Sequence, residues 1–83
     1  GEIFVIQNQV RAFVTSNFYV AEPDTLKDVD SLLDSGVIDS TGVLEIIAFI
    51  EETFDLAVED AEILPENLDS IERISNFVVR KMK

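Results

Sequence analysis

Ser40 is the residue of this sequence best placed to take part in covalent chemistry. It follows a long connection and opens a segment whose apolar residues have helical spacing. A Ser in the first turn of a helix is exposed and lies near backbone N–H groups that favour a bound phosphate. The simpler interpretation is that Ser40 only caps the helix, because Ser is among the preferred N-cap residues. Local sequence alone favours the capping role.

Other chemistry is limited by the residue types present. The 83 residues include no Cys and no His, which excludes thiol nucleophiles, imidazole bases and zinc sites built on sulfur or nitrogen. An EF-hand loop that starts at Asp28 would have its first two oxygen ligands in Asp28 and Asp30. Leu32 and Leu33, however, occupy the next two positions, which require an oxygen ligand and a Gly. We therefore expect no specific metal site, only weak binding of divalent ions, and no catalytic activity of its own.

The charge of the chain is strongly negative. Seventeen acids against six bases give −11, and no Lys or Arg lies between Asp28 and Glu72. Such a surface repels nucleic acid and anionic membranes and favours basic protein surfaces. The 47% apolar content predicts a folded chain. We expect a single domain over residues 1–83, without membrane insertion, monomeric and cytoplasmic.

Apolar periodicity predicts an all-α four-helix bundle with a long loop between the first two helices. The three main helices are expected over residues 2–18, from 39 or 40 to 52 or 54, and from 69 or 70 to the C-terminal end. A short helix of one or two turns, interrupted by Pro65, is expected within 59–68. The loop over 19–39 is expected to pack on the core, with one helical turn around 31–33. The expected inward-facing residues are Ile3, Ile6, Val10, Phe13, Val14, Phe18, Val43, Ile46, Ile47, Ile50, Phe54, Ile71, Ile74, Phe77 or Val78, and Met82.

The second predicted helix also has an outward side. Apolar and small residues on this side lie beside glutamates, and the combination is typical of either a solvated face or an edge to which a partner docks. The residues concerned are Thr41, Leu44, Ala48, Glu45, Glu51 and Glu52.

Residues 32–47, with the sequence LLDSGVIDSTGVLEII, resemble the phosphopantetheine attachment region of acyl carrier proteins. Phe54-Asp55-Leu56, the ENLDSI sequence at 66–71, the small size and the acidity are also similar to this family. The segment before Ser40 is closer to free-standing, specialised carriers, and Thr41 and Gly42 depart from the usual Leu and acid.

The resemblance implies that Ser40 carries 4′-phosphopantetheine, transferred from coenzyme A by a phosphopantetheinyl transferase. Asp39 would help to position that enzyme and its metal, and it is also able to cap the helix. Glu45, Glu51 and Glu52 match acidic docking positions, and Leu44 and Ala48 match apolar ones, with Thr41 beside them. The implied function is to hold an acyl group as a thioester and to deliver it to acyl-processing enzymes of fatty acid, lipid or secondary-metabolite biosynthesis.

Two alternatives remain open at this point. One is an aminoacyl or peptidyl carrier, for example of the D-alanyl type, loaded by an adenylating ligase. The other is a small acidic protein-interaction module in which Ser40 is only a helix cap.

Overall fold

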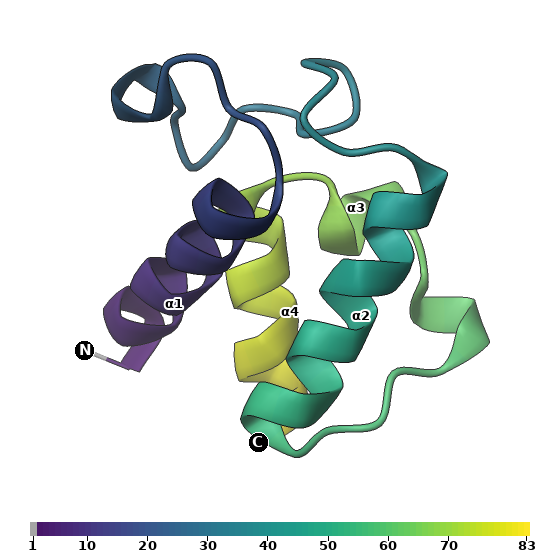
Figure 1. Cartoon of the computed structure of the whole chain (residues 1–83). Helices are drawn as coiled ribbons and strands as arrows, with labels where there is room; N and C mark the ends of the chain where they lie inside the picture. The colour runs from purple at the N-terminus through teal and green to yellow at the C-terminus, as the bar shows by residue number, and fades with distance from the viewer. Residues whose placement is uncertain (1) are drawn as a thin grey trace.

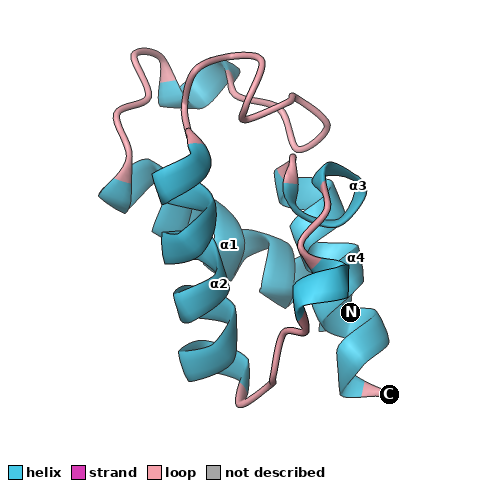
Figure 2. Cartoon of the chain, turned by 90° about the vertical axis from the view of Figure 1, so that its right-hand side faces the viewer, coloured by secondary structure: helices cyan, strands magenta, loops and turns pink. Residues whose placement is uncertain are grey.

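The computed structural model describes residues 2–83, and the described part of the chain is helical without strands. Its elements are α1 (Glu2–Asn17), η1 (Pro23–Thr25), α2 (Ser40–Phe54), η2 (Asp60–Glu62), α3 (Pro65–Leu68) and α4 (Ile71–Met82). Figures 1 and 2 show α1, α2 and α4 with the long connection between α1 and α2 lying across one end. The prediction of an all-helical chain with three main helices and one long loop is confirmed. The three main helices have 16, 15 and 12 residues.

The core is formed by side chains from all three main helices and from the loop. The fully buried members with the largest side chains include Phe77, Leu32, Ile46, Ile50, Ile71 and Ile74. The prediction that Met82 faces inward is wrong, because its side chain is 46% exposed. It is the last residue of α4, at the end of the packed helix, where the neighbouring layer no longer covers it. Both Phe77 and Val78 are buried.

The buried stripe of α2 is narrower than the sequence pattern predicts. Ile46 and Ile50 are buried, whereas Val43, Ile47 and Phe54 are only partly buried and pack against the core from its edge. Gly42 continues the buried stripe towards the start of the helix. A Cβ at Gly42 would lie 3.0 Å from the Cβ of Ile38 and 3.1 Å from the ring of Phe18. The glycine therefore allows the loop and the end of α1 to approach the first turn of α2.

The long loop packs on the core through three buried apolar residues, Leu26, Leu32 and Ile38. The expected helical turn around 31–33 is present as a single turn over residues 31–35, which does not continue into a helix. The backbone nitrogen of Ser35 donates to Ser31 O at 3.1 Å, and Gly36 then takes a positive φ of 79°. This left-handed residue, which suits glycine, ends the turn before helical hydrogen bonds continue. The 3₁₀ helix η1 was not expected.

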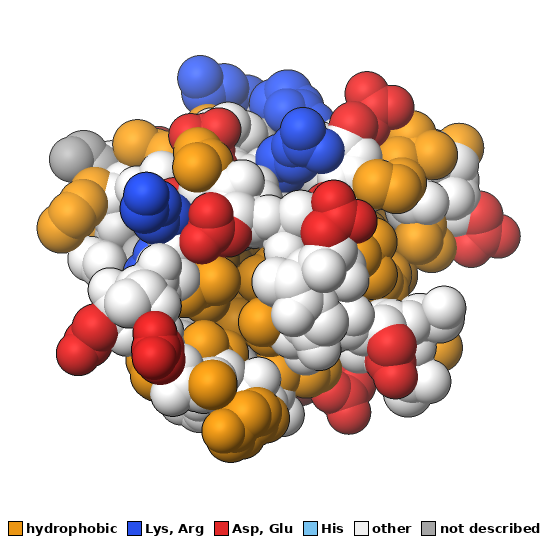
Figure 3. Space-filling view, turned by 90° about the horizontal axis from the view of Figure 1, so that it is seen from above, with side chains coloured by type: hydrophobic (Ala, Val, Ile, Leu, Met, Phe, Trp, Pro, Cys, Tyr) orange, Lys and Arg blue, Asp and Glu red, His pale blue; other side chains and the backbone are white. Residues whose placement is uncertain are grey.

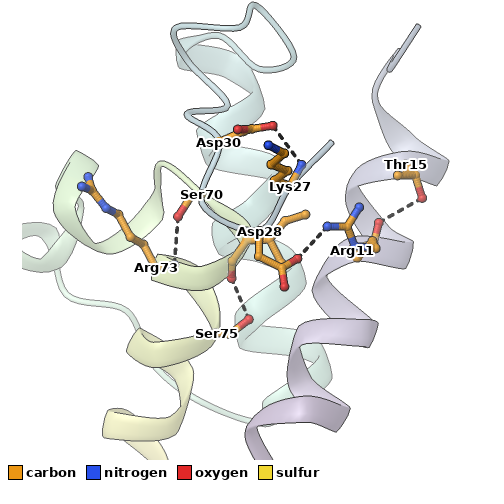
Figure 4. Close-up of polar contacts among 9 residues, drawn as sticks. Arg11, Thr15, Lys27, Asp28, Asp30, Ser70, Arg73 and Ser75 are labelled. Carbon is orange, nitrogen blue, oxygen red and sulfur yellow. Dashed lines mark hydrogen bonds and ion pairs between the residues drawn. The ribbon is translucent and has the colours of Figure 1, made fainter. Parts of the chain in front are cut away.

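The first half of this loop is fixed to α1 and α4, and Figure 4 shows its contact with α1. The guanidinium of Arg11 donates to the carboxylate of Asp28 at 2.6 Å. The backbone carbonyl of Asp28 accepts from Glu72 N at 2.9 Å. An N–H group in the first turn of α4, which has no partner within the helix, is thereby satisfied by the loop.

The segment after α2 contains two short helices instead of one. Asp55 has a left-handed backbone conformation with φ 56° and ends α2. Pro65 does not interrupt a helix here but begins α3, in agreement with its fixed φ and its missing N–H group. None of the helices in the described residues is long and apolar enough to cross a membrane.

Candidate functional site

Ser40 is the first helical residue of α2, and its cap is the preceding residue. The Asp39 side chain accepts a hydrogen bond from Gly42 N at 2.9 Å, and its backbone carbonyl accepts from Val43 N at 3.1 Å. Asp39 has extended φ and ψ angles of −124° and −168°, as an N-cap requires. The interpretation of Ser40 as the helix cap is therefore wrong. Its side chain is exposed and donates no hydrogen bond to any other described residue.

An apolar pocket of about 300 Å³ opens beside Ser40; we call it the Ser40 pocket. It lies between the first half of α2, the turn before α2, and the η2–α3 segment. Ser40 is the polar side chain among its lining residues, which are Leu33, Ser40, Val43, Leu44, Ile63, Leu64, Pro65 and Leu68. Three of the leucines are exposed at its edge, with exposed fractions of 37% for Leu33, 63% for Leu44 and 41% for Leu64. A group attached to Ser40 would have an apolar surface directly beside it.

Sequence reasoning missed most of the walls of this pocket. Val43 was expected only as an inward-facing residue of the second main helix. Leu33 was expected in the long loop and in the segment that resembles the attachment region, but not as a wall beside Ser40. Ile63 and Leu64 are 23 or more positions from Ser40 along the chain, so local spacing carries no signal for their placement. The apolar Ile63-Leu64-Pro65 sequence, which lies among acidic residues, was the only sequence signal for this wall.

The wall made by η2 and α3 is fixed to the last turns of α4 by polar contacts. The ammonium of Lys81 donates to Glu62 Oε1 at 2.8 Å, and the same oxygen accepts from Glu59 N at 2.9 Å. The guanidinium of Arg80 donates to Asn67 Oδ1 at 2.8 Å. The pKa of Glu62 lies below its ordinary value of 4.5, chiefly because the Lys81 ammonium donates to its carboxylate and secondly because the backbone of Glu59 does so. The bases of α4 thus hold the pocket wall, in addition to favouring the helix dipole.

The outward residues of α2 occupy two adjacent strips. Leu44 borders the Ser40 pocket, and Thr41 is exposed beside it. The second strip, Glu45, Ala48 and Glu52, lines a cleft of about 290 Å³ between α2 and α1. We call it the α1–α2 cleft. Its floor includes Phe13 and Phe49, whose rings are stacked with centroids 4.2 Å apart.

Glu51 differs from the other two glutamates of α2. Its Oε2 accepts a hydrogen bond from Val58 N at 3.0 Å, which ties α2 to the segment before η2. Glu45 and Glu52 make no ion pair with another described residue. The structure therefore leaves Glu45 and Glu52 available to a partner and gives Glu51 a role within the chain.

The acidic surface is visible from the loop end of the molecule. Figure 3 shows Lys and Arg side chains gathered towards the top and left of this view, while acidic side chains are spread over both sides and adjoin hydrophobic ones on the right-hand side. In Figure 1, α2 and the segment that follows it lie on that side. Within the described residues, no group of three or more acidic side chains is arranged to hold a metal ion.

Comparisons with known proteins give no family for this chain. No protein-family model matches it, and a search of curated proteins found no match. The function proposed below therefore depends on the residues and geometry of this chain.

Proposed function

We propose that this protein is a carrier that holds an acyl group on a 4′-phosphopantetheine arm attached to Ser40 and delivers it to partner enzymes. One observation supports this most directly: the Ser40 hydroxyl is exposed at the start of α2, free of a capping role, and borders an apolar pocket. The arm supplies the thiol that this chain lacks, on which cargo is held as a thioester. The chain itself is not an enzyme in this function.

The residues around Ser40 fit attachment by a separate transferase. Ser40 Oγ would attack the pantetheine-side phosphorus of coenzyme A and form an O–P bond. The bond from that phosphorus to the bridging oxygen of the pyrophosphate breaks, adenosine 3′,5′-bisphosphate leaves, and the hydroxyl proton is released. Asp39 Oδ1 is engaged by Gly42 N, whereas Oδ2 accepts from no described residue. The carboxylate can thus cap α2 with one oxygen and present the other to the metal of the transferase.

Partners in this function are proteins with basic docking surfaces. They would include the phosphopantetheinyl transferase, a loading ligase and downstream acyl-processing enzymes. Glu45 and Glu52 offer carboxylates that are not paired within the described chain, and Leu44 offers an exposed apolar contact beside Ser40. Such charged contacts mainly raise encounter rates and weaken with salt, which suits a carrier that must leave each partner. The helical layout is compatible with the four-helix bundle of carrier domains.

The lining of the Ser40 pocket favours an acyl over an aminoacyl cargo. Its other lining residues are apolar, and a charged amino group placed among them would lose hydration without gaining a partner. An aliphatic chain would instead remove apolar surface from water. The aminoacyl carrier is therefore the second choice.

A small interaction module without a covalent arm is the competing function of another class. It would explain the acidic surface, but its assignment of Ser40 as the cap disagrees with the geometry, because Asp39 is the cap. The two functions differ in one measurable property, namely whether Ser40 is modified.

The test is to incubate the purified protein with coenzyme A and a promiscuous phosphopantetheinyl transferase and to measure intact mass. We expect the wild type and Ser16→Ala to gain one phosphopantetheinyl group and Ser40→Ala to gain none. Ser16 is an exposed hydroxyl on α1 and serves as the matched control. An unmodified wild type would refute the carrier function, and a modified Ser40→Ala variant would refute the site.

A further inference from the structure

Asp69, between α3 and α4, makes three hydrogen bonds to consecutive residues of the long loop. Its backbone carbonyl accepts from Leu32 N at 2.7 Å. Its carboxylate accepts from Ser31 Oγ through Oδ2 at 2.6 Å and from Leu33 N through Oδ1 at 2.9 Å. Both carboxylate oxygens and the carbonyl of one residue are thus directed at one short piece of loop.

These contacts fix the turn that forms one wall of the Ser40 pocket. Ser31 Oγ, while it donates to Asp69, also accepts from Asp34 N at 3.0 Å. Leu32 is completely buried, and Leu33 lines the pocket together with Ser40. The position of Leu33 relative to Ser40 therefore depends on the carboxylate of Asp69.

The same turn is hydrogen-bonded to the chain just before Ser40. The carbonyl of Leu32 accepts from Ile38 N at 3.1 Å. Ile38 is buried and lies against Gly42, in the first turn of α2. A continuous path of contacts thus runs from Asp69 through Leu32 and Ile38 to the turn that carries Ser40.

The α4 helix does not need Asp69 as its cap. Ser70 is the N-cap, and its Oγ accepts from Arg73 N at 3.0 Å, as Figure 4 shows. A role in favouring the helix dipole would be filled by any nearby acid and would not require both oxygens to bond to the loop. The geometry of Asp69 is explained by the loop it holds.

We propose that Asp69 is a positioning residue for the Ser40 site, which holds the turn over residues 31–33 so that the pocket wall and the start of α2 keep their relative places. This inference rests on the proposed carrier function for its consequence, the rate at which Ser40 is modified. The hold on the loop itself is independent of that function.

The experiment compares Asp69→Ala with Asp69→Asn and with Val10→Ala. An Asn can accept from Leu33 N and donate to Ser31 Oγ, which has a second lone pair, so it should restore the contacts. Val10 is a buried residue of α1 outside this path, and its truncation serves as a control for lost stability alone. Ser31→Ala removes one contact without changing Asp69. If Asp69→Ala fails to fold, Ser31→Ala takes its place and is compared with Asp69→Asn.

Two measurements are made on each variant. The first is hydrogen exchange at the amides of Leu33 and Asp34, which for Asp69→Ala should be about tenfold faster relative to amides in α4, because the opening is local. The second is steady-state modification of Ser40, for which kcat/KM should fall about tenfold, since small displacements of a reacting group have large effects on rate. Asp69→Asn should remain close to the wild type in both measurements. Val10→Ala should not speed exchange at Leu33 and Asp34 relative to α4, and it should not lower kcat/KM as Asp69→Ala does.

Unchanged exchange at Leu33 and Asp34 in Asp69→Ala would overturn the proposal, as would equal losses of kcat/KM in Asp69→Ala and Val10→Ala. If the wild type itself is not modified, the carrier function fails, and the exchange measurement alone decides whether Asp69 holds the turn. The two failures are therefore distinguishable.

Discussion

Asp39 Oδ1 accepts a hydrogen bond from the backbone nitrogen of Gly42 at 2.9 Å, and this contact determines what the neighbouring Ser40 can do. Both Asp and Ser are good N-caps, but one helix start needs only one of them. Because Asp39 takes that position, the Ser40 hydroxyl is exposed beside the pocket.

The first prediction separates capping from charge at Asp39. Asp39→Ala should lower the free energy of unfolding by about 1 kcal/mol, because the cap is lost. Asp39→Asn keeps an acceptor for Gly42 N and should cost less than that. If the carboxylate also serves the transferase, Asp39→Asn should still slow modification of Ser40. Urea denaturation and modification rates measure the two effects, and an Asn variant modified at the wild-type rate would show that the charge is not used.

The helices could be predicted from sequence because their patterns depend on near neighbours. Ile46 and Ile50 of α2, and Ile71 and Ile74 of α4, are buried as the three- and four-residue spacing predicts. Periodicity does not state where packing ends along a helix, which is why Met82 was predicted wrongly. The choice of Asp39 over Ser40 as the cap depends on the residue at which the backbone turns from extended to helical, and the residue types do not fix that point.

The loop and the pocket could not be predicted, because distant residues build them. The turn over 31–33 is held by Asp69, which lies 36 to 38 positions away in the hydrogen-bonded pairs. The pocket wall comes from η2 and α3, which Lys81 holds in place from the end of α4. Local sequence placed Ser40 and Leu44 on α2 but gave no information on what lies opposite them.

The second prediction concerns Gly42. Helix propensity alone would make Gly42→Ala stabilising by about 1 kcal/mol. The added Cβ would lie 3.0 Å from the Cβ of Ile38, a buried residue whose Cβ cannot move away by side-chain rotation alone. Since overpacking typically costs about 1–3 kcal/mol, we expect a net loss of up to about 2 kcal/mol in the free energy of unfolding. Thermal and urea denaturation check this, and a more stable alanine variant would contradict the close packing.

The third prediction divides the glutamates of α2. Glu45→Lys and Glu52→Lys should each slow transfer to a basic partner enzyme by several-fold at low salt, with a smaller effect at high salt. The control is Glu22→Lys, an equal charge change on the exposed loop. Glu51→Lys should also lower stability, because its contact with Val58 N is lost. Equal rates for Glu45→Lys, Glu52→Lys and Glu22→Lys would remove the case for docking on α2.

The last prediction concerns the pH dependence of the contact between Glu62 and Lys81. The pKa of Glu62 is lowered in the folded protein, chiefly because the Lys81 ammonium donates to its carboxylate at 2.8 Å. A lowered pKa means that the unfolded chain binds the proton more readily, so this contact stabilises the fold above the ordinary pKa of 4.5 and loses its effect as pH falls through the lowered value. Protonation of the other acids acts in the opposite direction, because it relieves repulsion in a chain of net charge −11.

The comparison of wild type with Lys81→Met cancels most of that common effect. We expect the wild type to be the more stable of the two at pH 7 and the difference to shrink as the pH is lowered below 4.5. Urea denaturation across this range, with Glu62→Gln and the double variant completing a cycle, measures the coupling, and a difference that does not change with pH would show that Lys81 stabilises the pocket wall without the charge of Glu62.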